Sequence, residues 1–214
     1  MKISYTILAY NEVIELERLF KQLIQYKTKE DEILVLLDSS KDISQEMLKL
    51  LLSFSTNGAN LSIYKNPLNN DFANQKNFIG KKATGDYIIS VDVDEYFHPY
   101  FLENVHQILE INKDVDAILM PRINIVEGMT EEDIKKYHWR TNDKNWINFP
   151  DSQSRIYKNK PEIYWKNKVH EQLRGYEIAA RLPKRIEYCL MHIKTIKKQR
   201  SQNEFYSNII KYEK

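Results

Sequence analysis

A short apolar stretch that ends in three acidic residues is the feature that most constrains the fold of this chain. Tyr87–Val91 is almost entirely apolar or β-favouring and follows Gly85, which is typical of a strand buried on both faces. Asp92, Asp94 and Glu95 follow it directly. In open α/β sheets the ligand crevice lies outside the carboxyl ends of the strands. The stretch therefore predicts a ligand site at the end of a central strand.

Asp92 and Asp94 are candidate metal ligands. If the strand continues, side chains two residues apart point to the same side. Neighbouring carboxylates repel each other, and a cation between them removes the repulsion while using their hard oxygens as ligands. Two simpler interpretations stay open: a solvated turn that ends the strand, or an N-cap for a helix starting near Pro99.

Strand-like and helix-like segments alternate through the first half of the chain. The expected strands are Ile3–Ala9, Ile33–Leu37 and Leu61–Tyr64. One expected helix starts after Asn11 as its N-cap, and three more span Ser44–Phe54, Phe72–Lys82 and Pro99–Ile111. This alternation predicts an α/β fold with a mostly parallel sheet covered by helices on both faces. No glycine-rich phosphate loop occurs, which argues against a dinucleotide enzyme or a P-loop NTPase.

After a strand at Asp116–Ile125 the alternation stops. We expect a short helix after Thr130, strands at Arg155–Lys158, Tyr164–Leu173 and Tyr188–Ile193, and a terminal helix. The chain is therefore divided into a ligand-binding half, residues 1–125, and a second half of the same domain, residues 126–214, which forms a small mixed lobe and ends in a basic helix.

The net charge of +2 on 214 residues argues against nucleic acid as a partner. Basic residues concentrate in Arg181–Lys214, which predicts either a peripheral membrane contact or a solvated helix face. Cys189 is the single cysteine, so no internal disulfide is possible. The absence of a signal-like start or a bilayer-length apolar run predicts a cytoplasmic or membrane-peripheral protein.

Four blocks in this order resemble the GT-A glycosyltransferases of family 2. They are Ala9-Tyr10-Asn11-Glu12, Asp38, Lys76-Asn77 with Gly85 downstream, and Asp92-Val93-Asp94. A later Val169-His170-Glu171 is similar to the Val-His-Glu of the branch related to lipopolysaccharide-core β-glycosyltransferases. The resemblance implies transfer of a sugar from a nucleotide-sugar donor, expected to be a UDP-sugar, to a hydroxyl, with inversion and with Mn²⁺ or Mg²⁺ as cofactor. The acceptor, whether glycan, lipid-linked or protein, is left open.

The resemblance also implies roles for single residues at the donor. Ala9, Tyr10, Asn11, Glu12 and Asp38 would hold the nucleotide; Lys76, where the family usually has arginine, would approach the diphosphate or the base; Asp92 would contact the ribose or the metal, and Asp94 the metal. Arg155 is expected to pair with phosphate. The alternatives are an Asx turn for Asp38, a solvated helix lysine for Lys76 and a surface ion pair for Arg155.

The general base is expected in the second half. Glu171, on an expected strand, is the first choice and Asp151 the reserve. His170 and His192 are candidate metal or diphosphate ligands, with a structural role as the alternative. Glu95 would lie behind the metal ligands or face solvent. Trp139, Trp146 and Trp165 would form either a sugar-stacking platform or core packing.

Two other functions stay open. One is a non-catalytic scaffold that binds a nucleotide or a glycan. The other is a sugar-phosphate nucleotidyltransferase, which the absence of a glycine-rich loop after the first strand disfavours.

Overall fold

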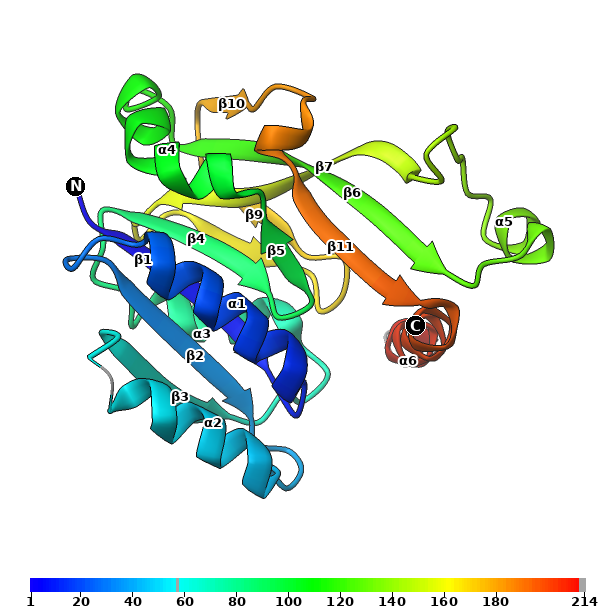
Figure 1. Ribbon diagram of the computed structural model, residues 1–214, viewed down its shortest axis with the longest axis horizontal. Coiled ribbons are helices and arrows are strands. Elements are labelled where there is room, and N and C mark those ends of the chain that lie inside the picture. Colours follow the sequence, from blue (N-terminus) through cyan, green and yellow to red (C-terminus); the bar gives the residue numbers. More distant parts are fainter. Residues whose placement is uncertain (57, 212–214) are drawn as a thin grey trace.

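The computed structural model describes residues 1–56 and 58–211. Within them the chain forms a nine-stranded sheet and a separate two-stranded hairpin (Figure 1). The strands of the large sheet are β1 (Ile3–Ala9), β2 (Glu32–Asp38), β3 (Leu61–Asn66), β4 (Tyr87–Asp92), β5 (Glu95–Phe97), β6 (Ala117–Glu127), β7 (Ile147–Lys158), β10 (Ala179–Arg181) and β11 (Leu190–Thr195). The hairpin pairs β8 (Tyr164–Lys166) with β9 (Gln172–Arg174). The helices are α1 (Val13–Tyr26), α2 (Gln45–Ser55), α3 (Phe72–Gly80), α4 (Pro99–Ile111), α5 (Glu131–Lys136) and α6 (Ile196–Lys211).

The first half is the predicted parallel layer. Strands β3, β2, β1 and β4 lie in that order, and each neighbouring pair is parallel. Side chains of β1, such as Tyr5 and Ile7, meet the apolar stripe of α1 on the face that α2 and α4 also cover. On the opposite face, Ile79 of α3 packs with Leu34 and Leu36 of β2. The predicted α/β class, with helices on both faces, is confirmed.

The predicted N-cap at Asn11 is wrong, and so is the alternative that the acidic run caps the helix near Pro99. Helix α4 spans the predicted residues, but its N-cap is His98, whose ring accepts a hydrogen bond from the backbone N–H of Tyr100 (3.2 Å). The acidic run is therefore not a cap. Helix α1 is preceded by Glu12 at the N-cap position, because the amide of Asn11 turns away towards residues 42 and 44.

The second half completes the same sheet. Strand β7 pairs antiparallel with both β4 and β6, and β11 runs parallel to β6. The expected boundary at residue 125 lies inside β6, so strands from both halves interleave. Strand β7 begins at Ile147, earlier than expected, because the polar, half-buried residues Asp151–Ser154 separate Ile147 and Phe149 from the apolar end of the strand.

The predicted strand over Tyr164–Leu173 is interrupted by a loop at residues 167–171. Asn167 and His170 adopt positive φ values of 75° and 53°, which a continuous strand does not contain. Glu171 therefore lies in the loop immediately before β9, and its expected place on a strand is wrong.

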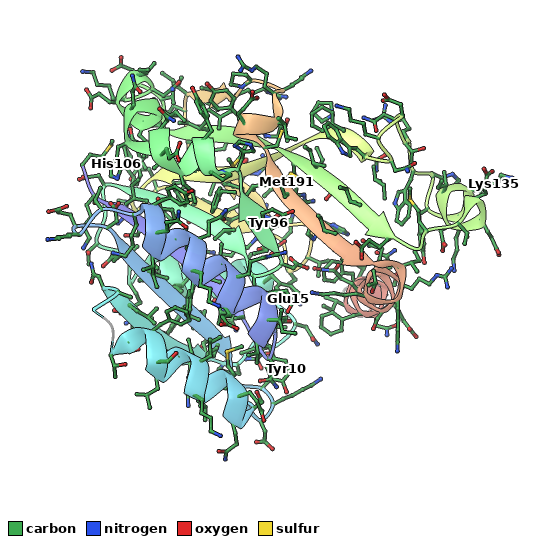
Figure 2. All side chains as sticks on the ribbon, in the orientation of Figure 1. Tyr10, Glu15, Tyr96, His106, Lys135 and Met191 are labelled. Atoms are coloured by element: carbon green, nitrogen blue, oxygen red, sulfur yellow. The ribbon has the colours of Figure 1, made fainter. Side chains whose placement is uncertain are left out.

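Helix α6 lies beside the far end of β11 and β6, while α5 projects away from the body, as the position of Lys135 shows (Figures 1 and 2). Residues 212–214 of the expected basic segment lie outside the described residues. Among the helices described, none has the length and apolar character needed to cross a membrane.

Candidate functional site

The acidic run lies at the carboxyl edge of the parallel layer. Strand β4 ends at Asp92, the next two residues form a turn, and β5 starts at Glu95. Strand alternation therefore does not extend to Asp94, and the two aspartates have different partners.

Asp92 is held by two cations from distant parts of the chain. Its carboxylate accepts a hydrogen bond from Nη2 of Arg155 and lies 3.6 Å from Nζ of Lys76. Burial alone would raise the pKa of Asp92, but Arg155, Lys76 and Arg122 hold this pKa well below its usual range. The side chain of Arg155 is 3% exposed, so the alternative of a surface ion pair is wrong.

Lys76 connects Asp92 to the predicted general base. Its Nζ lies 3.3 Å from Oε1 of Glu171 and 4.6 Å from the ring centroid of Trp165. The lysine side chain is 5% exposed, so it is not a solvated helix residue. Trp165 is itself buried and donates to the hydroxyl of Tyr157, which fits the core-packing alternative for this tryptophan. The ammonium thus places Glu171 beside the acidic motif.

Behind the motif lies a buried network of Glu95, Arg122 and Asp151. Glu95 is fully buried and accepts from Arg155 (2.6 Å) and Arg122 (2.9 Å), so it does not face solvent. Arg122 also donates to Asp151 through Nε (3.0 Å) and Nη2 (2.7 Å). Burial raises and Arg122 lowers the pKa of Asp151, with a net lowering. This network links side chains of β5, β6 and β7, and Asp151 is an acceptor within it.

Asp94 lies with His192 and Lys198. Its Oδ2 is 3.5 Å from Nε2 of His192 and 3.4 Å from Nζ of Lys198. Burial alone would raise the pKa of Asp94, but the hydrogen bond and charge of His192, together with Lys194 and Lys198, lower it. Lys198 also reaches Oε1 of Glu15 on α1 (3.3 Å), and Figure 2 shows Glu15 on the side of α1 towards α6.

Asp94 and His192 offer a donor set that fits a divalent cation. Nδ1 of His192 lies 2.8 Å from Oδ1 of Asn124, which can only accept, so a neutral ring would keep its proton on Nδ1 and turn the lone pair of Nε2 towards Asp94. Among the described residues there is no cluster of three or more His, Cys, Asp or Glu side chains able to hold a metal. Sites that share a cation with substrate phosphates need only one or two carboxylates from the protein.

The expected nucleotide residues lie at the carboxyl ends of β1 and β2. Oδ1 of Asp38 accepts from the backbone N–H groups of Ser40 and Leu68 (2.9 Å each), so the Asx turn is present. The hydroxyl of Tyr10 donates to the carbonyl oxygen of Asp42 (3.0 Å). Glu12 accepts from the backbone N–H of Tyr10 (2.8 Å), which tightens the turn that follows the buried Ala9.

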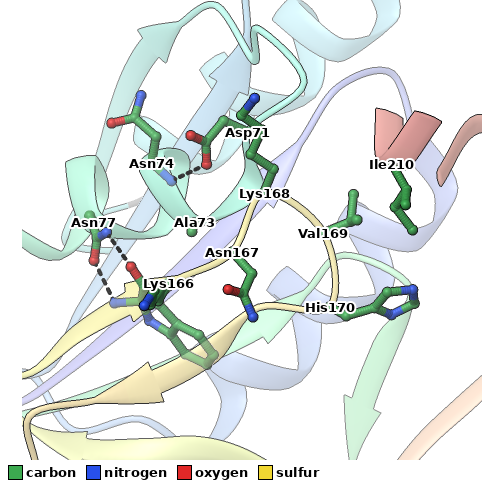
Figure 3. Close-up of a pocket in the computed structure, with 11 residues that line it drawn as sticks. Asp71, Ala73, Asn74, Asn77, Lys166, Asn167, Lys168, Val169, His170 and Ile210 are labelled. Carbon is green, nitrogen blue, oxygen red and sulfur yellow. Dashed lines mark hydrogen bonds between the residues drawn. The ribbon is translucent and has the colours of Figure 1, made fainter. Parts of the chain in front are cut away.

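His170 has other partners than His192. Its ring makes an edge contact with Tyr206 of α6, with centroids 5.6 Å apart. It lines a cavity of about 560 Å³ between α3, the loop before β9 and Ile210 (Figure 3). Its role as a metal ligand stays a prediction, and no contact places it on Asp94. Trp139 and Trp146 pack against Tyr137 and Phe149, and their stacking role is likewise untested.

The sequence analysis did not predict three residues of the candidate site: Arg122, Asn124 and Lys198. The first two are polar residues two apart in the apolar stretch of β6 that ends at Val126, and this spacing places both on one face of the strand. That pattern was the available signal. Lys198 is one basic residue among several in the tail, and nothing local distinguishes it.

Comparison with known proteins indicates the family of this chain. The family model described as Glycosyl transferase family 2 matches residues 4–181. An uncharacterized glycosyltransferase of Haemophilus influenzae is 25% identical over 119 residues, which are 56% of this chain and 38% of that protein.

Solved structures of S. aureus TarS are also similar. TarS 1–349 in complex with UDP-GlcNAc gives a TM-score of 0.64 at 18% identity, over 89% of this chain and 58% of that chain. The complex with UDP gives 0.63 at 16% identity, over 98% and 65%. The chain spans less than two thirds of the length of each of these relatives. The likeness confirms the predicted GT-A fold, and because the family match covers most of its length, the chain belongs to glycosyl transferase family 2.

Proposed function

We propose that the chain transfers a sugar from a UDP-sugar to a hydroxyl acceptor, with inversion and with a divalent cation. The observation that carries this proposal is the pairing of Asp94 with His192 beside the Asp92–Lys76–Glu171 chain of contacts. Family membership supports glycosyl transfer, and the TarS structures named as complexes with UDP-GlcNAc and UDP support the donor class.

The donor is proposed to lie along the carboxyl edge of the parallel strands. Tyr10 would contact the base, and Asp38 would accept a ring N–H through Oδ2, which makes no hydrogen bond to the described residues. Asp94 and His192 would hold Mn²⁺ or Mg²⁺. When bound, such a cation stabilises the negative charge that develops on the leaving diphosphate.

Glu171 is the proposed general base. A hydroxyl is too weakly acidic to ionise by itself, so a carboxylate or histidine must take its proton as the oxygen attacks the anomeric carbon. Lys76 orients Glu171 through their 3.3 Å contact and compensates part of its charge in a nearly buried setting. Asp151 is the weaker candidate, because its carboxylate oxygens already accept from Arg122, Asn124 and Gln153.

The test is Asp94→Asn. We expect hydrolysis of UDP-sugars in the presence of Mn²⁺ to fall by at least about 100-fold, because one group that positions charge at the reacting centre is lost. Asp114→Asn, an exposed aspartate on the loop after α4, is the matched control and should retain full activity. Undiminished Mn²⁺-dependent hydrolysis by Asp94→Asn would contradict the proposal.

A non-catalytic scaffold is the second candidate. Lys76 and Arg155 form ion pairs with Asp92, and Lys198 forms an ion pair with Asp94. The negative charges of both aspartates are therefore compensated by side chains of the protein itself. Calorimetry with UDP, followed by the hydrolysis assay, separates the two functions. Binding of UDP without turnover of any UDP-sugar would favour the scaffold.

A further inference from the structure

A second cavity, of about 350 Å³, lies beside Glu171. Ser152, Gln153 and Ser154 of β7 line one side, and Glu171 lines the other side with Gln172 and Arg174 of β9. Small-molecule sites occupy about 300–1,000 Å³, so the volume suits one small ligand or one end of a larger ligand.

The cavity exists because β7 lacks a partner strand on one edge here. Strand β7 pairs with β4 only through Ile156–Lys158, so no strand among the described residues lies beside residues 152–154 on that side. The far end of the hairpin is closed tightly. Gly175 has φ +80°, and a Cβ at this position would lie 1.7 Å from the carbonyl oxygen of Glu162. The wall formed by β9 is thus held in place by backbone packing.

The cavity adjoins the proposed reaction centre. Oε1 of Glu171 lies 3.3 Å from Nζ of Lys76, which lies 3.6 Å from Oδ1 of Asp92. A hydroxyl bound in the cavity can therefore reach Glu171 while a donor bound at Asp92 lies beyond Lys76.

The lining chemistry identifies a class of ligand. Serine hydroxyls and glutamine amides both donate and accept hydrogen bonds, as the hydroxyls of a sugar ring do. The lining residues Trp165 and Leu173 are 5% and 3% exposed and offer little apolar wall for an aliphatic alcohol, while the half-buried Tyr176 adds an aromatic ring with a polar hydroxyl.

We propose that this cavity binds a saccharide acceptor, an inference that rests on the proposed glycosyl transfer. Ser152, Ser154 and Gln172 bind the hydroxyls of the acceptor ring, and Glu171 contacts the reacting hydroxyl. As the acceptor oxygen bonds to the anomeric carbon, its proton passes to Glu171. The bond from the anomeric carbon to the diphosphate oxygen breaks, and its electron pair leaves with the diphosphate.

Saturation-transfer NMR with UDP and Mg²⁺ tests the inference. The probes are methyl β-glucoside, methyl β-galactoside, methyl α-mannoside and methyl β-N-acetylglucosaminide. We expect signal transfer to at least one glycoside in the wild type. The signal should be lost in Ser154→Tyr, which fills the cavity, while the UDP signal persists. Ser53→Tyr, an exposed site on α2, is the matched control and should retain both signals.

Each outcome separates the acceptor from the donor. If UDP gives a signal and none of the glycosides does, the saccharide site is overturned while the proposed function stands. If a glycoside signal persists in Ser154→Tyr, the saccharide binds elsewhere and the inference is also overturned. If UDP itself gives no signal in the wild type, the proposed function fails, and the inference fails with it.

A milder variant guards against misfolding of Ser154→Tyr. Ser154→Ala removes one hydroxyl from the cavity, and we expect the dissociation constant of the glycoside to rise roughly three- to tenfold. An unchanged dissociation constant in both Ser154→Ala and Ser152→Ala would contradict the assignment.

Discussion

Lys76 is the residue that links the acidic motif to the second half of the chain. It is buried on α3, contacts both Asp92 and Glu171, and lies over the ring of Trp165. A buried ammonium needs such partners, because removing one would leave a charge without compensation. The ammonium of Lys76 thus lies between the carboxylates of Asp92 and Glu171.

Glu171→Gln tests the proposed base. The amide keeps the shape of the side chain but cannot take a proton, so we expect kcat to fall about 10²- to 10⁴-fold. UDP affinity, measured by calorimetry, should change little, because Glu171 lies on the acceptor side of Lys76. A large loss of UDP affinity with unchanged kcat would instead make Glu171 a donor-binding residue.

Asp116 offers a test of stability against pH. Its carboxylate pairs with Lys160 (2.8 Å) and accepts from the backbone N–H of Glu177 (3.1 Å), and these contacts lower its pKa to about 2. Since the pKa in the folded state lies below the unfolded value near 3.8, the ionised group stabilises the fold above about pH 4, and this contribution is lost as the pH falls through about 2.

For Asp116→Asn we therefore expect a loss of about 1–3 kcal/mol in the free energy of unfolding at pH 7. The difference from wild type should shrink as the pH approaches about 2. Urea unfolding at pH 7 and pH 2.5 measures both values, with Asp114→Asn as control. An equal difference at both pH values would show that Asp116 acts by shape and not by charge.

At the scale of elements, α6 carries basic side chains to the candidate site. Lys198 reaches Asp94, and Lys194, at the end of β11, is buried nearby; burial lowers its pKa to about 8 although Asp94 opposes the shift. Farther along, Arg200 pairs with Asp133 of α5 (2.8 Å). These three cations of the basic segment, Lys194, Lys198 and Arg200, are therefore engaged within the protein, and the expected contact of this segment with a membrane stays a prediction.

Lys198→Met tests how α6 affects the metal. The ammonium must leave Asp94 before a cation binds there, and an ion pair whose lysine is 38% exposed is worth about 0.2–1 kcal/mol. We expect Mn²⁺ to bind the variant roughly two- to fivefold more tightly, measured by the loss of the free-Mn²⁺ EPR signal. Lys197→Met, on an exposed side chain one residue earlier, should bind as wild type does. Weaker binding by Lys198→Met would mean that the lysine supports the metal site.

For the whole molecule, the candidate site joins segments that fold together in one sheet. Strands from both halves interleave, and β7 lies between β4 and β6. A ligand that contacts both β1 and β11 therefore stabilises the entire sheet.

UDP with Mn²⁺ should accordingly raise the melting temperature. A ligand at about 100 times its Kd adds about 2.7 kcal/mol, which for a chain of this size corresponds to roughly 5–10 °C. Differential scanning fluorimetry with UDP and Mn²⁺, against UDP with EDTA and against ADP with Mn²⁺, measures the shift and its metal and base dependence. An unchanged melting temperature at millimolar UDP would count against a donor site.

Local signals were enough for the parallel layer. The strands β1, β2 and β4, helix α4 and the acidic end of β4 follow from hydrophobic periodicity and helix or turn signals within windows of about ten residues, and the structure confirms them. The N-caps considered at Asn11 and at the acidic run were wrong, because these side chains bind other groups. Asn11 accepts from the backbone N–H of Ser44, and Glu95 accepts from Arg122.

What the amino-acid sequence determined by itself is the alternation of strands and helices and the place where the acids emerge, since both depend on neighbours along the chain. Only the tertiary structure decided that Asp92 pairs with Arg155 and Lys76 while Asp94 faces His192. It also decided that Glu171 lies in a loop, and not on a strand, next to Lys76. These partners lie far apart in the chain. An ion pair forms between the charges that the order of the strands brings close together, and no local sequence pattern specifies that order.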